Sequence, residues 1–110
     1  ATFVPHGVDA VRTLAAATAL WPALMADAEA RVEALAMRGA LHHWTGQPRS
    51  AADDLGQAWT LLGDDGDPAQ RVVVGNRLLR VRLTLGEIDG ALTLGDRVLA
   101  LAEASGVRIG

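Results

Sequence analysis

Glycine and proline divide the chain into segments of similar length, and this punctuation constrains the fold more than any other feature. Within the segments, apolar side chains recur at intervals of three and four residues, which is the period of an α-helix. Glycine and proline favour the ends of helices over their interiors. The segments cover residues 8–20, 27–45, 49–62, 69–85 and 88–104. We therefore predict five helices joined by short turns.

The composition points to the same all-α fold class. Half of the residues are hydrophobic but only 4% are aromatic, so the apolar side chains are mostly those of Ala, Leu and Val. Small and unbranched side chains in this proportion suit closely packed helices better than sheets. No segment shows the alternation of a strand, and the β-prone stretch 71–75 continues a helical pattern of apolar residues through Val81. At 110 residues, the chain suits one domain with a single modest core.

Charge and cysteine content exclude several classes of function. The formal net charge is −3, whereas a nucleic-acid-binding face is normally basic. We therefore expect no direct contact with nucleic acid. The chain has no cysteine, so it has neither a disulfide framework nor thiol chemistry. This absence fits the cytoplasm, where we expect the protein to reside.

One uncharged segment, Thr13–Ala26, raises the question of a membrane. Its 14 residues fall short of the roughly 20 that span a bilayer as a helix. The length matches the core of a signal peptide, but Arg12 is the only positive charge before it and Asp9 lies in the same flank. We expect a helix buried in the core here, in preference to a targeting segment, and no association with a membrane.

The chain also repeats itself at an interval of 40 residues. Pairs of identical residues with this spacing include Gly46 with Gly86, Ala51 with Ala91, and Leu61 with Leu101. Each glycine closes one helix and each alanine lies five residues later in the next, so the unit is a helical hairpin. A tight turn requires a residue that tolerates a positive φ. Because a hairpin cannot bury its apolar face alone, we expect neighbouring units to stack.

The first full unit, residues 27–62, resembles the tetratricopeptide repeat family. The family signature is roughly W-x2-L-G-x2-Y, then G, then A-x3-F and A. The matching positions of this chain are Leu35, Arg38, Gly39, His42, Gly46, Ala51, Leu55 and Ala58. Arg38 replaces a leucine of the pattern, His42 replaces its tyrosine, and the proline that ends a unit is missing.

The second full unit, residues 69–104, follows the pattern less closely. Gly86 and Ala91 match it, whereas Arg82 occupies the position of the large aromatic residue and Gly95 occupies another large position. Residues 8–20 would be the second helix of a preceding, partial unit. The resemblance thus implies a short α-solenoid of stacked antiparallel hairpins over residues 1–110, as one domain and as a fragment of a larger protein.

Degenerate repeats of about 40 residues resemble those of large bacterial ATP-dependent transcriptional activators and signalling proteins. The resemblance implies a cytoplasmic protein–protein interaction or scaffold module with a protein or peptide partner, and also self-association. The alternative is a small-molecule-sensing domain, with Trp44, Trp59 and Met37 as apolar contacts. No nucleophile with a base partner and no phosphate-binding motif occurs. We therefore expect neither enzymatic activity nor a cofactor.

The same resemblance predicts which residues line the ligand groove. They are Met37, Ala40, His43, Trp44, Asn76, Arg77 and Arg80. Arg77 and Arg80 are three residues apart and share a helix face. Together with Asn76 they could hold a carboxylate, since a guanidinium offers a planar fork of donors. The alternative is that both arginines are solvated or paired with acidic side chains of the adjacent helix.

Two further motifs are weaker candidates for a site. The adjacent His42 and His43 point about 100° apart on a helix, so they do not bind one metal ion together. We expect His42 to pack between the paired helices, with a ring nitrogen bonded to a neighbour. A calcium-binding EF-hand needs a glutamate at the twelfth position of its loop. Counted from Asp64 of the acidic loop Gly63–Pro68, that position is Gly75. We therefore predict no metal site.

Overall fold

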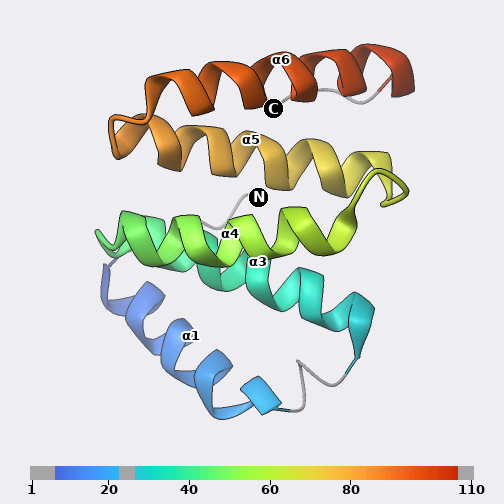
Figure 1. Cartoon of the computed structure of the whole chain (residues 1–110). Coiled ribbons are helices and arrows are strands. Elements are labelled where there is room, and N and C mark those ends of the chain that lie inside the picture. The colour runs from blue at the N-terminus through green and yellow to red at the C-terminus, as the bar shows by residue number, and fades with distance from the viewer. Residues whose placement is uncertain (1–6, 23–26, 107–110) are drawn as a thin grey trace.

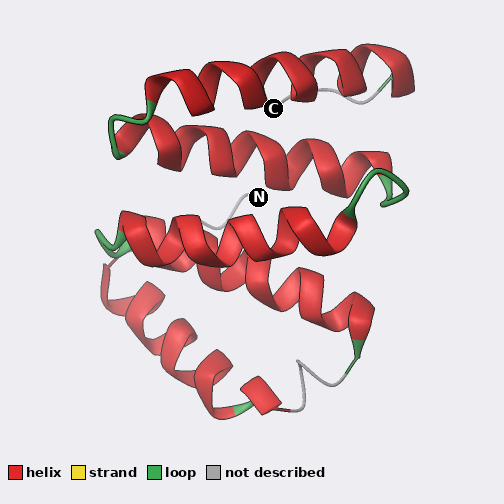
Figure 2. Cartoon of the chain, in the orientation of Figure 1, coloured by secondary structure: helices red, strands yellow, loops and turns green. Residues whose placement is uncertain are grey.

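The computed structural model describes residues 7–22 and 27–106. The helices in this part of the chain are α1 (Gly7–Ala19), α3 (Ala28–Trp44), α4 (Pro48–Leu62), α5 (Pro68–Thr84) and α6 (Ile88–Ser105). The described residues contain no strand, as Figure 2 shows, so the predicted all-α fold is confirmed. Each helix begins and ends within one residue of the range that the sequence predicts.

The helices pack in chain order. α3 and α4 form one antiparallel hairpin, α5 and α6 form a second, and α4 packs against α5 to join them. α1 packs against α3 at one end of the stack, and α6 lies at the other end (Figure 1). α3 and α5, the first helices of the two hairpins, also contact each other. The two hairpins therefore present their first helices side by side.

The two hairpin turns have the same backbone structure. At the end of α3, the N–H of Gly46 donates to the carbonyl of His43 and the N–H of Gln47 donates to that of His42. Forty residues later, Gly86 and Glu87 make the corresponding two bonds at the end of α5. This pattern is the Schellman motif, which requires a left-handed residue at the turn. Gly46 and Gly86 supply it, with φ of 76° and 79°.

The beginnings of α3 and α5 are equivalent as well. A carboxylate oxygen of Asp67 accepts the N–H of Gln70 at 3.1 Å, and Asp67 is the N-cap of α5. Forty residues earlier, a carboxylate oxygen of Asp27 accepts the N–H of Ala30 at 3.1 Å. Capping satisfies one of the N–H groups that the first turn of a helix leaves without a partner. The equivalence of the two units thus extends from the helix start through the turn.

One contact inside each hairpin pairs a glycine with a leucine. The glycine is on the first helix in the first unit and on the second helix in the second unit. A Cβ added to Gly39 would lie 2.7 Å from Cγ of Leu55, so Leu55 fills the space that Gly39 leaves open. In the second unit Leu79 stands at the position of Gly39, and Gly95 stands at that of Leu55. Leu79 is the nearest side chain to the site of a Cβ on Gly95, at 3.9 Å. Gly95, a poor match to the family pattern, is therefore the small partner of Leu79.

A buried ion pair in the first unit corresponds to an apolar pair in the second. Nε and Nη2 of Arg38 donate to the two carboxylate oxygens of Asp54 at 2.8 and 2.7 Å, and Asp54 is buried. Their equivalents 40 residues on are Leu78 and Leu94, both buried in the core of the second hairpin. Arg38 departs from the leucine of the family pattern because Asp54 stands opposite it, whereas Leu78 keeps an apolar residue there.

The expectation of a buried core helix in the segment Thr13–Ala26 is wrong for most of its described part, although Trp21 packs against the core. Residues 13–19 are helical, but the described side chains of this stretch are mostly exposed, and so is Leu20. The reason is positional: among the described helices, α1 packs against α3 alone. Residues 23–26 lie outside the described part. No helix among the described residues is long and apolar enough to cross a membrane.

Candidate functional site

A groove lies between the first helices of the two hairpins, α3 and α5, and has a volume of about 430 Å³. Along α3 the lining positions Glu33, Met37, Ala40 and Trp44 follow at intervals of three and four residues. Along α5 they are Gln70, Val73 and Arg77, with the same spacing. Each set is one face of a helix. Because these two faces lie next to each other, residues from both units form a single groove.

Four of the seven residues that the resemblance assigns to the groove line it. They are Met37, Ala40, Trp44 and Arg77. His43 lies at the end of the α3–α5 contact, where its Nε2 is 3.5 Å from Oγ1 of Thr84. Asn76 is half-buried and Arg80 is exposed, and neither lines the groove. The structure therefore brings Arg77 alone of the proposed carboxylate-binding group to the groove.

Sequence reasoning missed Val73 and Glu33, although a signal for both was present. Val73 precedes Arg77 by four residues and Glu33 precedes Met37 by four, so each lies one turn earlier on the same face. Val73 is an exposed valine. If the predicted groove faces of α3 and α5 are extended by one turn toward the start of each helix, they include both residues.

The groove is mostly apolar, with one positive and one negative side chain on its walls. Trp44 is 50% exposed and Met37 and Val73 are also exposed, so three large apolar side chains face solvent together. Scattered apolar side chains are normal on a surface, but a contiguous group marks a binding surface. Among the described residues of the lining, Arg77 is the only cation and Glu33 the only carboxylate. The groove can thus hold an apolar group and bind an anionic group at Arg77.

His42 and the residues around it form a structural cluster. The Nε2 of His42 lies 3.5 Å from Oδ2 of Asp54. Oδ2 also accepts the bond from Nε of Arg38, and Oδ1 accepts the bond from its Nη2. The guanidinium carbon of Arg38 lies 3.7 Å from the centre of the Trp21 ring. His42 therefore packs between α3 and α4, as predicted. The predicted bond to a ring nitrogen is not found at Nδ1, which is buried without a hydrogen-bond partner among the described residues.

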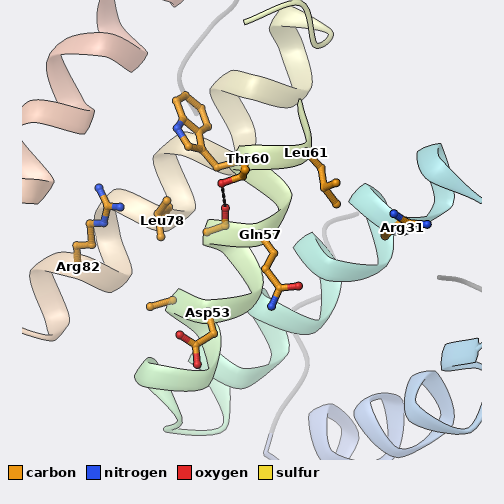
Figure 3. A pocket seen from close by; sticks show the side chains of 10 residues that line it. Arg31, Asp53, Gln57, Thr60, Leu61, Leu78 and Arg82 are labelled. Atoms are coloured by element: carbon orange, nitrogen blue, oxygen red, sulfur yellow. Dashed lines mark hydrogen bonds between the residues drawn. The ribbon is translucent and has the colours of Figure 1, made fainter. Parts of the chain in front are cut away.

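A larger hollow of about 940 Å³ lies over α4, and its lining is more polar. In Figure 3, Arg31 of α3 and Arg82 of α5 lie on opposite sides of α4, with Asp53 and Gln57 between them. Several of its polar groups are engaged within the chain: Oγ1 of Thr60 donates to the carbonyl of Gly56, and Nη1 of Arg82 contacts the carbonyl of Gly90 at 3.4 Å. The side chains do not converge on one point, so the α3–α5 groove is the better candidate site.

The acidic loop contributes to packing between helices. Nη1 of Arg71 donates to the carbonyl oxygen of Asp64 at 3.2 Å, and the Asp64 carboxylate lies 3.6 Å from Arg71 and 3.8 Å from Arg97. Both guanidinium groups lie within 6 Å of the Trp59 ring, at 5.6 and 5.8 Å. Among the described residues, no group of three or more His, Asp or Glu side chains could hold a metal ion.

Comparisons of the chain with family models, with curated proteins and with solved structures find no match. The resemblance to tetratricopeptide repeats therefore stays a prediction that rests on the residues quoted above.

Proposed function

We propose that the chain is a protein-interaction module and that the α3–α5 groove binds a peptide segment of its partner. The observation that carries this proposal is the groove itself: Met37, Trp44 and Val73 present exposed apolar surface on two adjacent helices beside Arg77. The bound segment places an apolar side chain against Trp44 and an acidic group at Arg77. Tryptophan and arginine are the residue types most often responsible for binding energy at interfaces.

The repeat supports a relationship to tetratricopeptide-like solenoids. Two 40-residue units share their caps, turns and contact positions, and their first helices line the groove together. A role as the cytoplasmic scaffold region of a large bacterial transcriptional activator or signalling protein follows from the resemblance alone. The net charge of −3 favours a protein or peptide partner over nucleic acid.

A small-molecule-sensing domain is the second candidate, and the size of the groove favours it. Sites for small ligands have volumes of about 300–1,000 Å³, and the α3–α5 groove has about 430 Å³. Met37 and Trp44 line the groove as this alternative requires, with Arg77 as the handle for an anion. Trp59, its third apolar contact, packs against Gly75 on the other side of α5.

Selection from a random peptide library on the immobilised chain tests the peptide hypothesis. We expect selected peptides to combine a large apolar residue with Asp or Glu, and to bind Trp44→Ala and Arg77→Glu at least about tenfold more weakly than the wild-type chain. Leu61→Ala is a matched control, since Leu61 is similarly exposed and lies outside the groove. Peptides that bind all three variants equally would refute the groove as the site. A metabolite panel that shifts the Trp44 fluorescence, with no peptide selected, would favour the sensing alternative.

A further inference from the structure

The outer face of α6 carries a stripe in which acidic residues and leucines alternate. Asp89, Leu92, Asp96, Leu99 and Glu103 follow at intervals of three and four residues, so all five lie along one side of the helix. All five are exposed, Leu92 by 62% and Leu99 by 51%. Among the described helices α6 contacts α5 alone, as its place at the end of the stack in Figure 1 illustrates. No described helix covers the α6 stripe.

One unit earlier in the chain, the same positions form a helix-binding surface. The equivalents of Leu92, Asp96 and Leu99 are Ala52, Gly56 and Trp59 of α4. A Cβ on Gly75 of α5 would lie 2.8 Å from the Trp59 ring, so α5 packs directly on this surface. Ala52 and Gly56 border the same hollow as two side chains of α5. The α6 stripe therefore continues, by one repeat, an interface that the molecule already uses.

The helix that occupies the α4 surface is basic and amphipathic. Arg71, Gly75, Leu78 and Arg82 of α5 follow at intervals of four, three and four residues, and they face α4. The α6 stripe differs from the α4 surface in carrying three carboxylates. None of the three forms an ion pair with a residue that the structure describes, so all remain available to basic groups of a partner. The three carboxylates of the α6 stripe thus favour a basic helix more strongly than the α4 surface does.

A second copy of the chain does not fit this face. An antiparallel pairing of two α6 helices centred on Asp96 would place the two Asp96 side chains together and would set Asp89 against Glu103. Like charges in such positions are destabilising. The basic stripe of α5 is already covered by α4 in every copy. The α6 face therefore does not pair with itself, and a basic helix suits its charge better.

We propose that the α6 stripe docks a basic amphipathic helix of a partner protein. Arginine or lysine side chains of that helix pair with the carboxylates of Asp89, Asp96 and Glu103, and its apolar side chains pack between Leu92 and Leu99. This surface is separate from the α3–α5 groove, and each can be occupied without the other.

The probe for this surface is a fluorescently labelled peptide with the sequence of residues 67–86, which is α5 with its flanking residues. Fluorescence anisotropy with the whole chain should show saturable binding that weakens as salt rises, because exposed ion pairs are screened. We expect Leu92→Glu combined with Leu99→Glu to weaken binding at least about tenfold. Leu83→Glu is the matched control, since Leu83 is 46% exposed on α5, and this variant should bind like wild type.

A charge exchange makes the test specific for the stripe. A peptide with Arg71→Glu and Arg82→Glu should not bind wild type, and it should bind the chain that carries Asp89→Arg, Asp96→Arg and Glu103→Arg. Circular dichroism confirms that each variant is folded. Absence of saturable binding to wild type up to about millimolar peptide, or equal binding to the Leu92→Glu/Leu99→Glu variant, would overturn the proposal. The second outcome would mean that the peptide replaces α5 inside the hairpins.

Discussion

Replacement of the ion pair between Arg38 and Asp54 by two leucines should leave the stability of the chain nearly unchanged, whereas either single replacement should be destabilising. The second unit provides the precedent, because Leu78 and Leu94 stand at the equivalent positions and are buried. The double variant therefore gives the first hairpin the apolar pair that the second hairpin already has.

The two single variants should differ, because the two partners are not equally exposed. The side chain of Asp54 is 5% exposed and that of Arg38 is 24% exposed. Arg38→Leu leaves the carboxylate of Asp54 buried without its guanidinium partner, and should lower the free energy of unfolding by about 3–5 kcal/mol. Asp54→Leu leaves a guanidinium that can still reach water, and should cost about 1–3 kcal/mol.

The double variant should come within about 1 kcal/mol of wild type, because a well-packed apolar pair replaces a buried ion pair at little net cost. Its main loss is the contact between Arg38 and Trp21, worth about 0.5–1 kcal/mol. Urea denaturation followed by circular dichroism measures all four proteins. Additive effects, with the double variant about as unstable as the two singles together, would refute the equivalence of the two hairpin cores.

Three further predictions concern the helix contacts and ends. Gly39→Ala should lower stability by about 1–3 kcal/mol through its clash with Leu55, and a thermal melt that matches wild type would contradict this contact. Gly46→Ala and Gly86→Ala have open space around the new methyl group, so each should cost only the strain of a positive φ, about 1 kcal/mol. Unequal losses in urea midpoint would argue against equivalent turns. Asp27→Ala and Asp67→Ala should each cost about 1 kcal/mol, and Asn at either site, which retains a capping oxygen, should recover most of that loss.

The helices could be predicted from the sequence because their ends are decided by local chemistry. Gly46 and Gly86 provide the left-handed residue that a Schellman turn needs, and Pro48 and Pro68 occupy first-turn positions where a missing N–H costs nothing. The burial of α1 was predicted wrongly, because burial depends on what packs against a helix. A short apolar segment at the edge of the stack has the same sequence pattern as one at its centre.

The partners inside the hairpins could not be read from one repeat alone. Arg38 and Gly95 both depart from the tetratricopeptide repeat pattern. Each is explained by the residue opposite it, Asp54 for Arg38 and Leu79 for Gly95, which lies 16 residues away along the chain. The candidate groove was predicted in part: the helix faces that carry Met37, Trp44 and Arg77 do form it. The groove lining on α5 ends at Arg77, one turn before Arg80, and that limit is a consequence of tertiary packing.

The three tryptophans provide the most direct test of the central claim, which is that the α3–α5 groove is the peptide-binding site. Trp44 lies in the groove, Trp21 lies beside Arg38, and Trp59 packs on Gly75. Titration of the isotope-labelled chain with a selected peptide, followed through the three indole N–H signals in the NMR spectrum, reports on all three places at once. We predict that the Trp44 signal shifts saturably while those of Trp21 and Trp59 stay in place. A saturable shift of Trp59 or Trp21 with Trp44 unchanged would contradict the account.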